Sequence, residues 1–467
     1  MPLSGLRIRC AKCAPFLALF LSVSTLVVGQ SADAAGTLAE DYLPELKPIL
    51  QSAVRQAPDV ILKQIEIDRA EARIYDADRQ RWPNVSGDIS YNANQTAVSG
   101  NSNTQSRNSG LFYTVRANQA LFYWGEIKNR GEVARIGVAI QQKEYAEAYR
   151  TLVRQLRQLY LELVARNASL RQMRFELTLR EAQLATAREE LRAGTLPAGE
   201  VAGKELELSE RQVEVDRWQA QFDALRRTIG RLSGVGEIPA DKVPVEIPLP
   251  RYDARVSSEM LAAMLRDAGK NTFQAQIAEL QIQQAERNYR IARVRLLPKF
   301  EATAEHVRDS STTASETSVS QTAIQRETIG IHGRWDIFDG FATKGAKLEA
   351  RIARREAEKR LQVATDSAMA EAQSLERFAS LDARSVQLSE QRRSGAEAGV
   401  KKAEEERAAG RVSKDAVDSA LIGLRVAEAA ATSARANFLS DWSSFVSLVG
   451  EDPVLNNLPS RYVRSSR

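Results

Sequence analysis

The stretch Leu156–Gly194, LRQLYLELVARNASLRQMRFELTLREAQLATAREELRAG, carries the pattern that decides the fold. Its leucines recur at heptad spacing, the repeat of a coiled coil, at Leu156, Leu163, Leu170, Leu177, Leu184 and Leu191. Gly194 then supplies the residue type that commonly ends a helix. A second heptad series follows at Leu208, Val215, Phe222 and Ile229. The sequence therefore predicts a long helix over 127–193 that turns and returns as a helix over 198–233.

The whole arrangement occurs twice in the chain. Identical residues recur 215 or 216 positions apart, as in Pro83 and Pro298, Gly125 and Gly340, Arg135 and Arg351, Gly194 and Gly410, and Gly234 and Gly450. A shift held over more than 100 residues indicates an internal duplication. We therefore expect two homologous repeats, 38–235 and 253–450, joined by a proline-rich linker over 236–252 and followed by a tail over 451–467.

Each repeat is expected to contain the same elements in the same order. A first helix, about 43–80 or 257–295, ends before a helix–strand junction at Pro83 or Pro298. Two strands come next, about 84–95 and 110–123 in the first repeat and about 299–308 and 327–338 in the second. A long helix over 127–193 or 343–409 and a last helix over 198–233 or 413–449 complete the repeat. The long helices would measure roughly 100 Å, so two shorter helices stacked end to end would match one of them.

The composition fits such a helical chain. Of the 467 residues, 27% are charged and only 6% are aromatic, which suits long helices better than large globular cores. The formal net charge is +5, but the basic residues do not gather on one face, so no nucleic-acid partner is expected.

The N-terminus has the features of a secretory signal peptide over 1–34. Arg7, Arg9 and Lys12 precede an apolar run over 14–28, and small residues follow at Ala32-Asp33-Ala34. Both cysteines, Cys10 and Cys13, belong to this segment. No later apolar run is long enough for a membrane helix, so we expect an exported protein that would enter a membrane only as strands.

The strand segments alternate between apolar and polar residues. In the first, Val85, Ile89 and Tyr91 alternate with Ser86, Asp88 and Ser90. One lipid-compatible face and one hydrated face are typical of a transmembrane β-barrel, although an amphipathic soluble sheet explains any single strand equally well. The polar segments 96–108 and 309–325 are predicted to be extracellular loops. Aromatic residues near the strand ends are candidates for an interfacial girdle, namely Phe122, Tyr123, Trp124, Phe338 and Phe341.

Four strands cannot close a membrane barrel, and open strand edges are not tolerated in lipid. Eight strands are the usual minimum, so the chain is expected to oligomerise, and three copies would supply twelve strands. The need to close a barrel argues for a channel, but it does not fix the number of copies at three. Arg116, Asn118 and Arg334 are candidate barrel-lumen residues, although solvated polar faces need no specific role.

The ordered set of features resembles the TolC family of outer-membrane export channels. The duplication, the junctions Pro83 and Pro298, the segment Trp335-Asp336-Ile337-Phe338-Asp339-Gly340 and the helix ending at Leu448-Val449-Gly450 carry the resemblance. It implies a mostly α, α+β chain that forms a homotrimer in the outer membrane of a Gram-negative bacterium. Four strands per chain would close as a 12-stranded transmembrane β-barrel above a periplasmic α-helical barrel. Neither cysteine follows the apolar run, so the chain resembles the type I secretion and general-efflux branch more than the lipoprotein branch.

The resemblance also implies partners and a mode of action. Such channels dock a periplasmic adaptor (membrane fusion protein) and an inner-membrane ABC or proton-driven transporter, and they contact outer-membrane lipid. They pass proteins or small molecules, including drugs, outward without catalysis and without a cofactor. The hairpin tips would form the periplasmic entrance and the adaptor-docking site, at Gly194, Thr195, Leu196, Pro197, Gly410, Arg411, Val412 and Ser413.

Two acidic residues near the second tip are candidates for the entrance. Some members of the family carry acidic residues there that constrict the pore. Asp415 and Asp418 lie one turn apart on the expected helix. Counting from Gly410 places Ala416 and Ser419 at the usual acidic positions, and Asp415 also suits the first turn of a helix because of the helix dipole.

An enzyme and a periplasmic adaptor are two other classes of function that the sequence can be compared with. The two histidines, His306 and His332, both fall in predicted strands far from any cysteine, and no phosphate-binding loop or nucleophile motif is present, so no metal site and no enzyme activity are expected. The alternative is a periplasmic coiled-coil adaptor or scaffold without a membrane pore. Adaptors usually carry one helical hairpin and lack a duplicated pair of strands.

Overall fold

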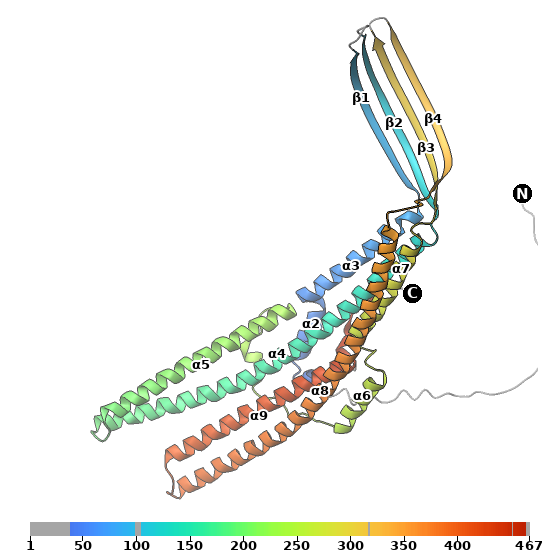
Figure 1. Cartoon of the computed structure of the whole chain (residues 1–467). Coiled ribbons are helices and arrows are strands. Elements are labelled where there is room, and N and C mark those ends of the chain that lie inside the picture. Colours follow the sequence, from blue (N-terminus) through green and yellow to red (C-terminus); the bar gives the residue numbers. More distant parts are fainter. Residues whose placement is uncertain (1–37, 99–103, 316–317, 451, 464–467) are drawn as a thin grey trace, which may run out of the picture.

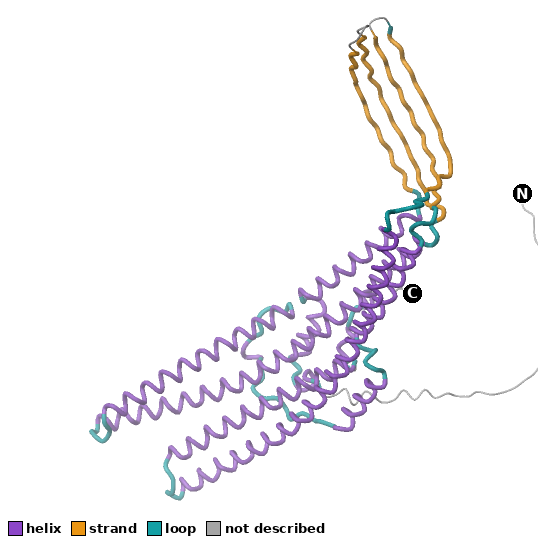
Figure 2. The backbone as a smooth tube through the Cα atoms, in the orientation of Figure 1, coloured by secondary structure: helices purple, strands orange, loops and turns teal. Residues whose placement is uncertain are grey.

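The computed structural model describes residues 38–98, 104–315, 318–450 and 452–463. The predicted signal peptide over 1–34, with both cysteines, lies outside the described residues. A four-stranded sheet stands at one end of an elongated body of helices, and two helical hairpins form the other end (Figure 1). The backbone trace separates the two regions, with strands on one side of the junction and helices on the other (Figure 2).

The two repeats have parallel element orders. The first comprises α1 (Ala39–Tyr42), α2 (Leu46–Gln56), α3 (Pro58–Asp78), β1 (Asn84–Val98), β2 (Thr104–Phe122), α4 (Glu126–Arg192) and α5 (Ala198–Ser233). The second comprises α6 (Ala254–Arg266), α7 (Phe273–Arg293), β3 (Lys299–Ser315), β4 (Val319–Arg334), α8 (Ala342–Ala408) and α9 (Lys414–Val449), and α10 (Ser460–Val463) follows. The long helices α4 and α8 each contain 67 residues, and α5 and α9 each contain 36.

The helices form a wall that is one helix thick. α4 packs against α3 and α5 on one side and against α7 and α9 on the other, and α8 packs against α7 and α9. The lateral order is therefore α3 with α5, then α4, then α7 with α9, then α8. In each short pair one helix continues the line of the other beside a long helix, as the lengths predicted (Figure 1).

The first helix of each repeat is broken, which corrects the single helices predicted over 43–80 and 257–295. Ala57 is extended with ψ 126° because Pro58 excludes the helical conformation from the residue before it. In the second repeat the break follows Arg266, where Ala268 and Gly269 have φ values of +50° and +67°. Both breaks lie beside the end of a shorter hairpin helix. The chain leaves α5 at Gly234 in contact with Gln56, and Leu448 near the end of α9 packs with Met264 of α6.

All four strands pair antiparallel in the order β1-β2-β3-β4. They are longer than predicted, since most of the polar segments 96–108 and 309–325 continue the strands instead of forming loops. Serine and threonine side chains suit a strand whose two faces are both in contact with water. Backbone hydrogen bonds between neighbouring strands hold such a strand in the sheet, so no alternation of apolar and polar residues is required. At the other end, β4 stops at Arg334, so residues 335–338 lie outside the strand predicted over 327–338.

The main core lies halfway along the helical body. There the short helices α1 and α2 and the C-terminal turn η3 (Pro453–Asn457) cover the middle of α4 and the end of α9. Its largest apolar members are fully buried, including Tyr145, Tyr149, Leu156, Tyr160, Phe438 and Phe445. Toward the hairpin tips only small clusters remain, such as Leu184, Ala187 and Val201. Among the described residues, no helix is long and apolar enough to cross a bilayer.

Candidate channel-forming site

The two faces of the sheet differ in chemistry. One register row joins Val85, Ala117, Ala304 and Ile329, all apolar. The next row joins Ser86, Arg116, Glu305 and Thr328, all polar, on the opposite face. Ile329 is 88% exposed and Ile89, on the same face, is 80% exposed. In the single chain, one face of the sheet is therefore an uncovered apolar surface, and the opposite face is polar.

The predicted lumen residues Arg116, Asn118 and Arg334 all lie on the polar face. Arg116 donates a hydrogen bond from Nη2 to Glu305 Oε1 at 2.6 Å across β2 and β3. Arg334 lies at the end of β4, where its Nε is 3.3 Å from Asp336 Oδ1. The register thus brings together on one face residues that are more than 200 positions apart in the chain.

The junctions between strands and long helices use left-handed backbone conformations. Gly125 precedes α4 with φ +80°, and Gly340 and Phe341 precede α8 with φ +62° and +68°. These positive values explain the recurring glycines, since a residue without a Cβ adopts them without strain. Pro83 and Pro298 stand directly before β1 and β3, where a missing N–H is tolerated.

Tryptophan side chains bind these junctions to each other. Trp124 donates its Nε1–H to the carbonyl oxygen of Pro298 at 2.8 Å, and Trp335 donates to that of Leu296 at 3.1 Å. Phe122 packs edge-on against Trp124, and Phe338 packs edge-on against Phe341. Members of this aromatic cluster remain exposed in the single chain, at Phe122, Trp124, Trp335, Phe338 and Phe341. A large apolar surface therefore surrounds the base of the sheet.

Both hairpin tips have the same backbone geometry. At the first tip, Thr195 donates its N–H to Glu190 O at 3.0 Å and Gly194 donates to Leu191 O at 3.0 Å. At the second tip, Arg411 donates to Glu406 O and Gly410 to Arg407 O, both at 2.9 Å. This is the Schellman pattern, which requires a left-handed residue, and Gly194 and Gly410 supply it with φ +77° and +72°. Pro197 and Ser413 then stand at the N-caps of α5 and α9.

The two acidic candidates at the second tip differ in environment. Asp415 is exposed in the first turn of α9, whereas Asp418 is only 7% exposed. Ser413 caps the same helix by accepting a hydrogen bond from the Ala416 N–H at 3.3 Å. Only Asp415 is therefore solvated in the single chain.

A buried ion cluster at mid-height was not apparent from the sequence. Arg157 of α4, 1% exposed, binds Glu40 of α1 and Asp452 before η3. Its Nη2 lies 2.6 Å from Glu40 Oε1, and its Nη1 lies 2.5 Å from Asp452 Oδ2. Burial alone would lower the pKa of Arg157, but hydrogen bonds and charges from the two carboxylates outweigh it and hold this pKa above its ordinary value.

A pair of carboxyl groups joins α8 to α9. Partial burial, the larger cause, and the nearby Asp382 carboxylate together raise the pKa of Asp441 to about 6. Burial likewise raises the pKa of Asp382. Like charges in a partly buried site disfavour double ionisation, so the pair takes up a proton more readily than isolated aspartates.

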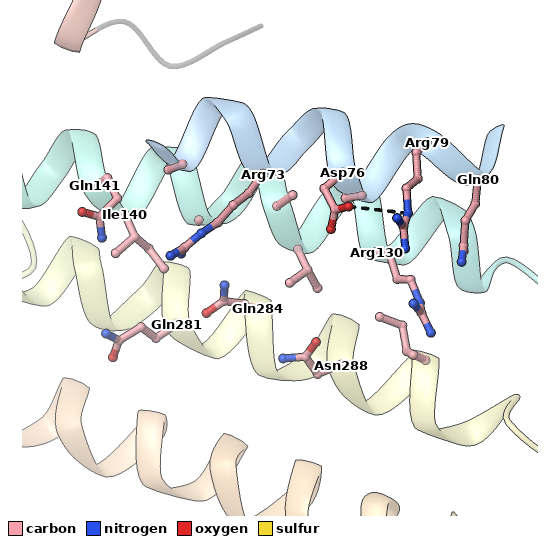
Figure 3. Close-up of a pocket in the computed structure, with 16 residues that line it drawn as sticks. Arg73, Asp76, Arg79, Gln80, Arg130, Ile140, Gln141, Gln281, Gln284 and Asn288 are labelled. Carbon is pink, nitrogen blue, oxygen red and sulfur yellow. Dashed lines mark ion pairs between the residues drawn. The ribbon is translucent and has the colours of Figure 1, made fainter. Parts of the chain in front are cut away.

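A polar groove of about 630 Å³ lies below the sheet between α3, α4 and α7 (Figure 3). Arg73 of α3 and Gln284 of α7 point toward one another across α4, and Arg130 stands nearer the strands. Arg79 pairs with Asp76, at 3.5 Å between Nε and Oδ1. Nothing in the local sequence pattern marks this groove, because three separate helices supply its lining. Within the described part of the chain, no group of three side chains is placed to bind a metal ion.

The comparisons with known proteins agree with this geometry. Residues 49–234 match the sequence profile of the family described as outer membrane efflux protein. No curated protein sequence matches the chain.

Solved structures share the fold over nearly the whole chain. CmeC, an outer-membrane channel of Campylobacter jejuni, is 13% identical with a TM-score of 0.71, and 92% of each chain is covered. The outer-membrane protein VceC of Vibrio cholerae is 15% identical with a TM-score of 0.64, covering 89% of this chain and 99% of its own. The open-state MtrE channel of Neisseria gonorrhoeae is 16% identical with a TM-score of 0.62, covering 87% and 89%.

The fold of these channels includes both repeats, and the sequence profile covers most of the first. An adaptor or scaffold is not favoured, because the match includes the strands as well as the hairpins. The family resemblance inferred from the sequence is therefore confirmed: residues 49–234 match the outer membrane efflux protein profile, and the fold of the whole chain is that of solved outer-membrane channels.

Proposed function

We propose that three copies of this outer-membrane efflux protein close into one channel, with a twelve-stranded barrel in the membrane and a helical tunnel in the periplasm. The observation that carries the proposal is the sheet. It has one apolar and one polar face, and its outer strands β1 and β4 each leave one edge unpaired in the single chain. In lipid such edges must be paired, so the sheet has to be completed by further strands.

The strand directions suit closure by identical copies. Neighbouring strands alternate in direction along β1-β2-β3-β4, so β4 of one copy is antiparallel to β1 of the next. Every added copy then extends the same antiparallel ladder. Two copies would give the minimum of eight strands and three give twelve, and the number three follows the family resemblance. Arg116, Asn118 and Arg334 would face the water-filled lumen.

The lateral edges of the helical wall support the same assembly. On α8, exposed apolar side chains follow one helical face at Leu348, Ile352, Val363, Phe378, Leu381 and Leu388. On the opposite edge, α3 and α5 expose Leu62, Ile65, Leu206 and Val213. These two stripes would meet between copies, because exposed apolar surface of this extent is typical of protein interfaces.

The channel would work as the exit duct of a tripartite system, without covalent chemistry and without a cofactor. Its hairpin tips, 194–197 and 410–413, would meet a periplasmic adaptor, and the adaptor would connect it to an inner-membrane ABC or proton-driven transporter. Proteins or small molecules would be the cargo. Asp415 would lie at the entrance, whereas the buried Asp418 would contribute through packing at the second tip.

The experiment that tests the proposal is purification from outer membranes followed by reconstitution in a planar lipid bilayer. We expect a heat-modifiable trimer on a denaturing gel and discrete single-channel conductance steps. Heat-denatured protein is the matched control and should give no steps. A soluble monomer that leaves the bilayer silent would contradict the proposal.

A further inference from the structure

The upper limit of the apolar face, at the end far from the helices, runs diagonally across the sheet. On β1 and β2 the large apolar side chains of this face reach Tyr91 and Leu111, which lie in one register row, and the small Ala93 and the polar Ser109 form the next row. On β3 and β4 the apolar face ends at Ala304 and Ile329, because the next residues on that face are His306 and Glu327. His306 Nδ1 lies 3.4 Å from Glu327 Oε1.

The register gives the distance, in residues, by which the upper limit of the apolar face shifts between β1 and β4. Ile329 shares its row with Val85, so the limit moves 91 − 85 = 6 residues between the β1 edge and the β4 edge. The lower limit moves in the same direction. Beyond β4, apolar residues continue at Trp335 and Ile337, while beyond β1 they end at Trp82.

A diagonal limit has a simple physical cause. The hydrocarbon layer is flat, and a charged side chain on the lipid face is destabilising within it. The apolar face must therefore keep a constant height in the membrane, so the register rows themselves climb relative to the membrane plane. Such a climb is the stagger that tilted strands produce in every closed barrel.

Resting on the proposed trimer, we propose that β4 of one copy pairs with β1 of the next so that Ile329 lies opposite Tyr91 of the next copy. This register brings the upper limit on β4 to the same height as the upper limit on the following β1. A row then rises six residues per copy. On the hydrated face, the same register places Thr328 opposite Asn92 and His332 opposite Asp88 of the next copy.

The strand tilt that follows is reasonable for a membrane barrel. Three copies give a total stagger of about 18 residues over twelve strands, which at about 3.3 Å per residue and 4.8 Å per strand corresponds to a tilt of about 46°. Membrane barrels have tilts of about 35–45°. A flat register with Ile329 opposite Val85 would give no stagger and no tilt, which a closed barrel does not allow.

The test is disulfide formation between copies in outer membranes. Thr328→Cys combined with Asn92→Cys should form covalent dimers and trimers under a mild oxidant, because residues directly opposite in a ladder have Cβ atoms about 5 Å apart. Thr328→Cys combined with Ser86→Cys tests the flat register and should form none. Each single cysteine variant is a further control, and conductance of the reduced protein verifies that every variant folds.

The cross-linking results test the strand register and the trimer proposal separately. Combinations of Thr328→Cys with Ser90→Cys or Asn94→Cys bracket the proposed pairing and should cross-link less than Asn92→Cys. If trimers form but another partner cross-links most strongly, the register is wrong and the channel proposal remains. If the unsubstituted protein is monomeric in the membrane, both proposals are overturned.

Discussion

At the residue scale, Arg157 shows how one side chain joins segments from both ends of the described chain. Its guanidinium binds a carboxylate 117 positions before it and another 295 positions after it. All three side chains are nearly inaccessible to water. A buried charge without partners is strongly unfavourable, so this cluster holds α1 and the C-terminal turn in one position against α4.

Replacing Arg157 with methionine should destabilise the protein strongly. Glu40 and Asp452 would remain buried without a cation, and loss of one partner in such a cluster costs about 3–5 kcal/mol. Unfolding in guanidinium chloride would measure the loss as a lower midpoint. The matched control is Arg360→Met, which removes an exposed pair with Glu356 and should cost less than about 1 kcal/mol. Equal effects of the two variants would contradict the structural role assigned to the cluster.

At the element scale, the pairing of α8 with α9 contains its own source of pH dependence. Asp382 and Asp441 bring two carboxyl groups together between these helices, whereas Glu390 of α8 and Glu428 of α9 each pair with an arginine. The raised pKa values mean that the folded helices bind a proton more tightly than the unfolded chain does. The stabilisation from this proton is complete below the ordinary aspartate pKa of about 3.9 and is lost as the pH rises through about 6.

Asp441→Asn should therefore raise the melting temperature at pH 7.5, where the unsubstituted Asp441, with a pKa of about 6, is ionised in a partly buried site beside Asp382. Between pH 5 and pH 7.5, the unsubstituted protein should lose stability relative to the variant, because Asp441 ionises with a pKa of about 6. Thermal unfolding followed by circular dichroism at both pH values measures the difference. Asp366→Asn, at an exposed position on the partner helix α8, serves as the control. A constant difference between Asp441→Asn and the unsubstituted protein at the two pH values would show that the pair does not titrate in this range.

The elements also show what local sequence patterns can predict. The leucine heptads and the glycines at 194 and 410 predict the hairpins because a coiled-coil seam and a Schellman turn are local features. The full length of the strands was missed, since the serine- and threonine-rich segments lack apolar alternation and gain their structure from the ladder. Pro58 marks the break within the helix predicted over 43–80, because a proline disfavours the helical conformation of the residue before it. Among the candidate residues, the tips and junctions were accessible from local patterns, whereas the Arg157 cluster and the groove between α3 and α7 depend on contacts between distant segments.

At the scale of the whole molecule, a wall one helix thick leaves each chain with two open sides. The apolar stripes on α8 and on α3 with α5 are exposed in a single copy, so the free energy of folding is coupled to association. The main core at mid-height is the only extensive region of the described chain in which several layers of side chains pack together. The upper and lower parts of the wall therefore depend more strongly on neighbouring copies.

A charge placed on the α8 stripe should weaken assembly without unfolding the hairpin. Leu388 is 55% exposed, so Leu388→Lys leaves the fold of one copy nearly intact but places an unpaired charge between copies. Trimer abundance after mild detergent extraction is expected to fall, and circular dichroism is expected to retain its helical signal. Gln387→Lys adds the same charge to an exposed neighbour outside the stripe, and its trimers should persist. Loss of trimers in both variants would argue that the stripe is not the interface.

The stacked helices have a mechanical consequence. At mid-height the helical column beside α4 is interrupted where α5 ends near the α2–α3 break, and the second column is interrupted where α9 ends near the break between α6 and α7. α4 and α8 continue through this level with unbroken backbone hydrogen bonds. The wall is therefore a set of continuous rods alternating with jointed ones, and torsion of the hairpins relative to the sheet concentrates at a single level. We expect bending of the wall to occur at these joints, because the unbroken backbone hydrogen bonds of α4 and α8 resist it.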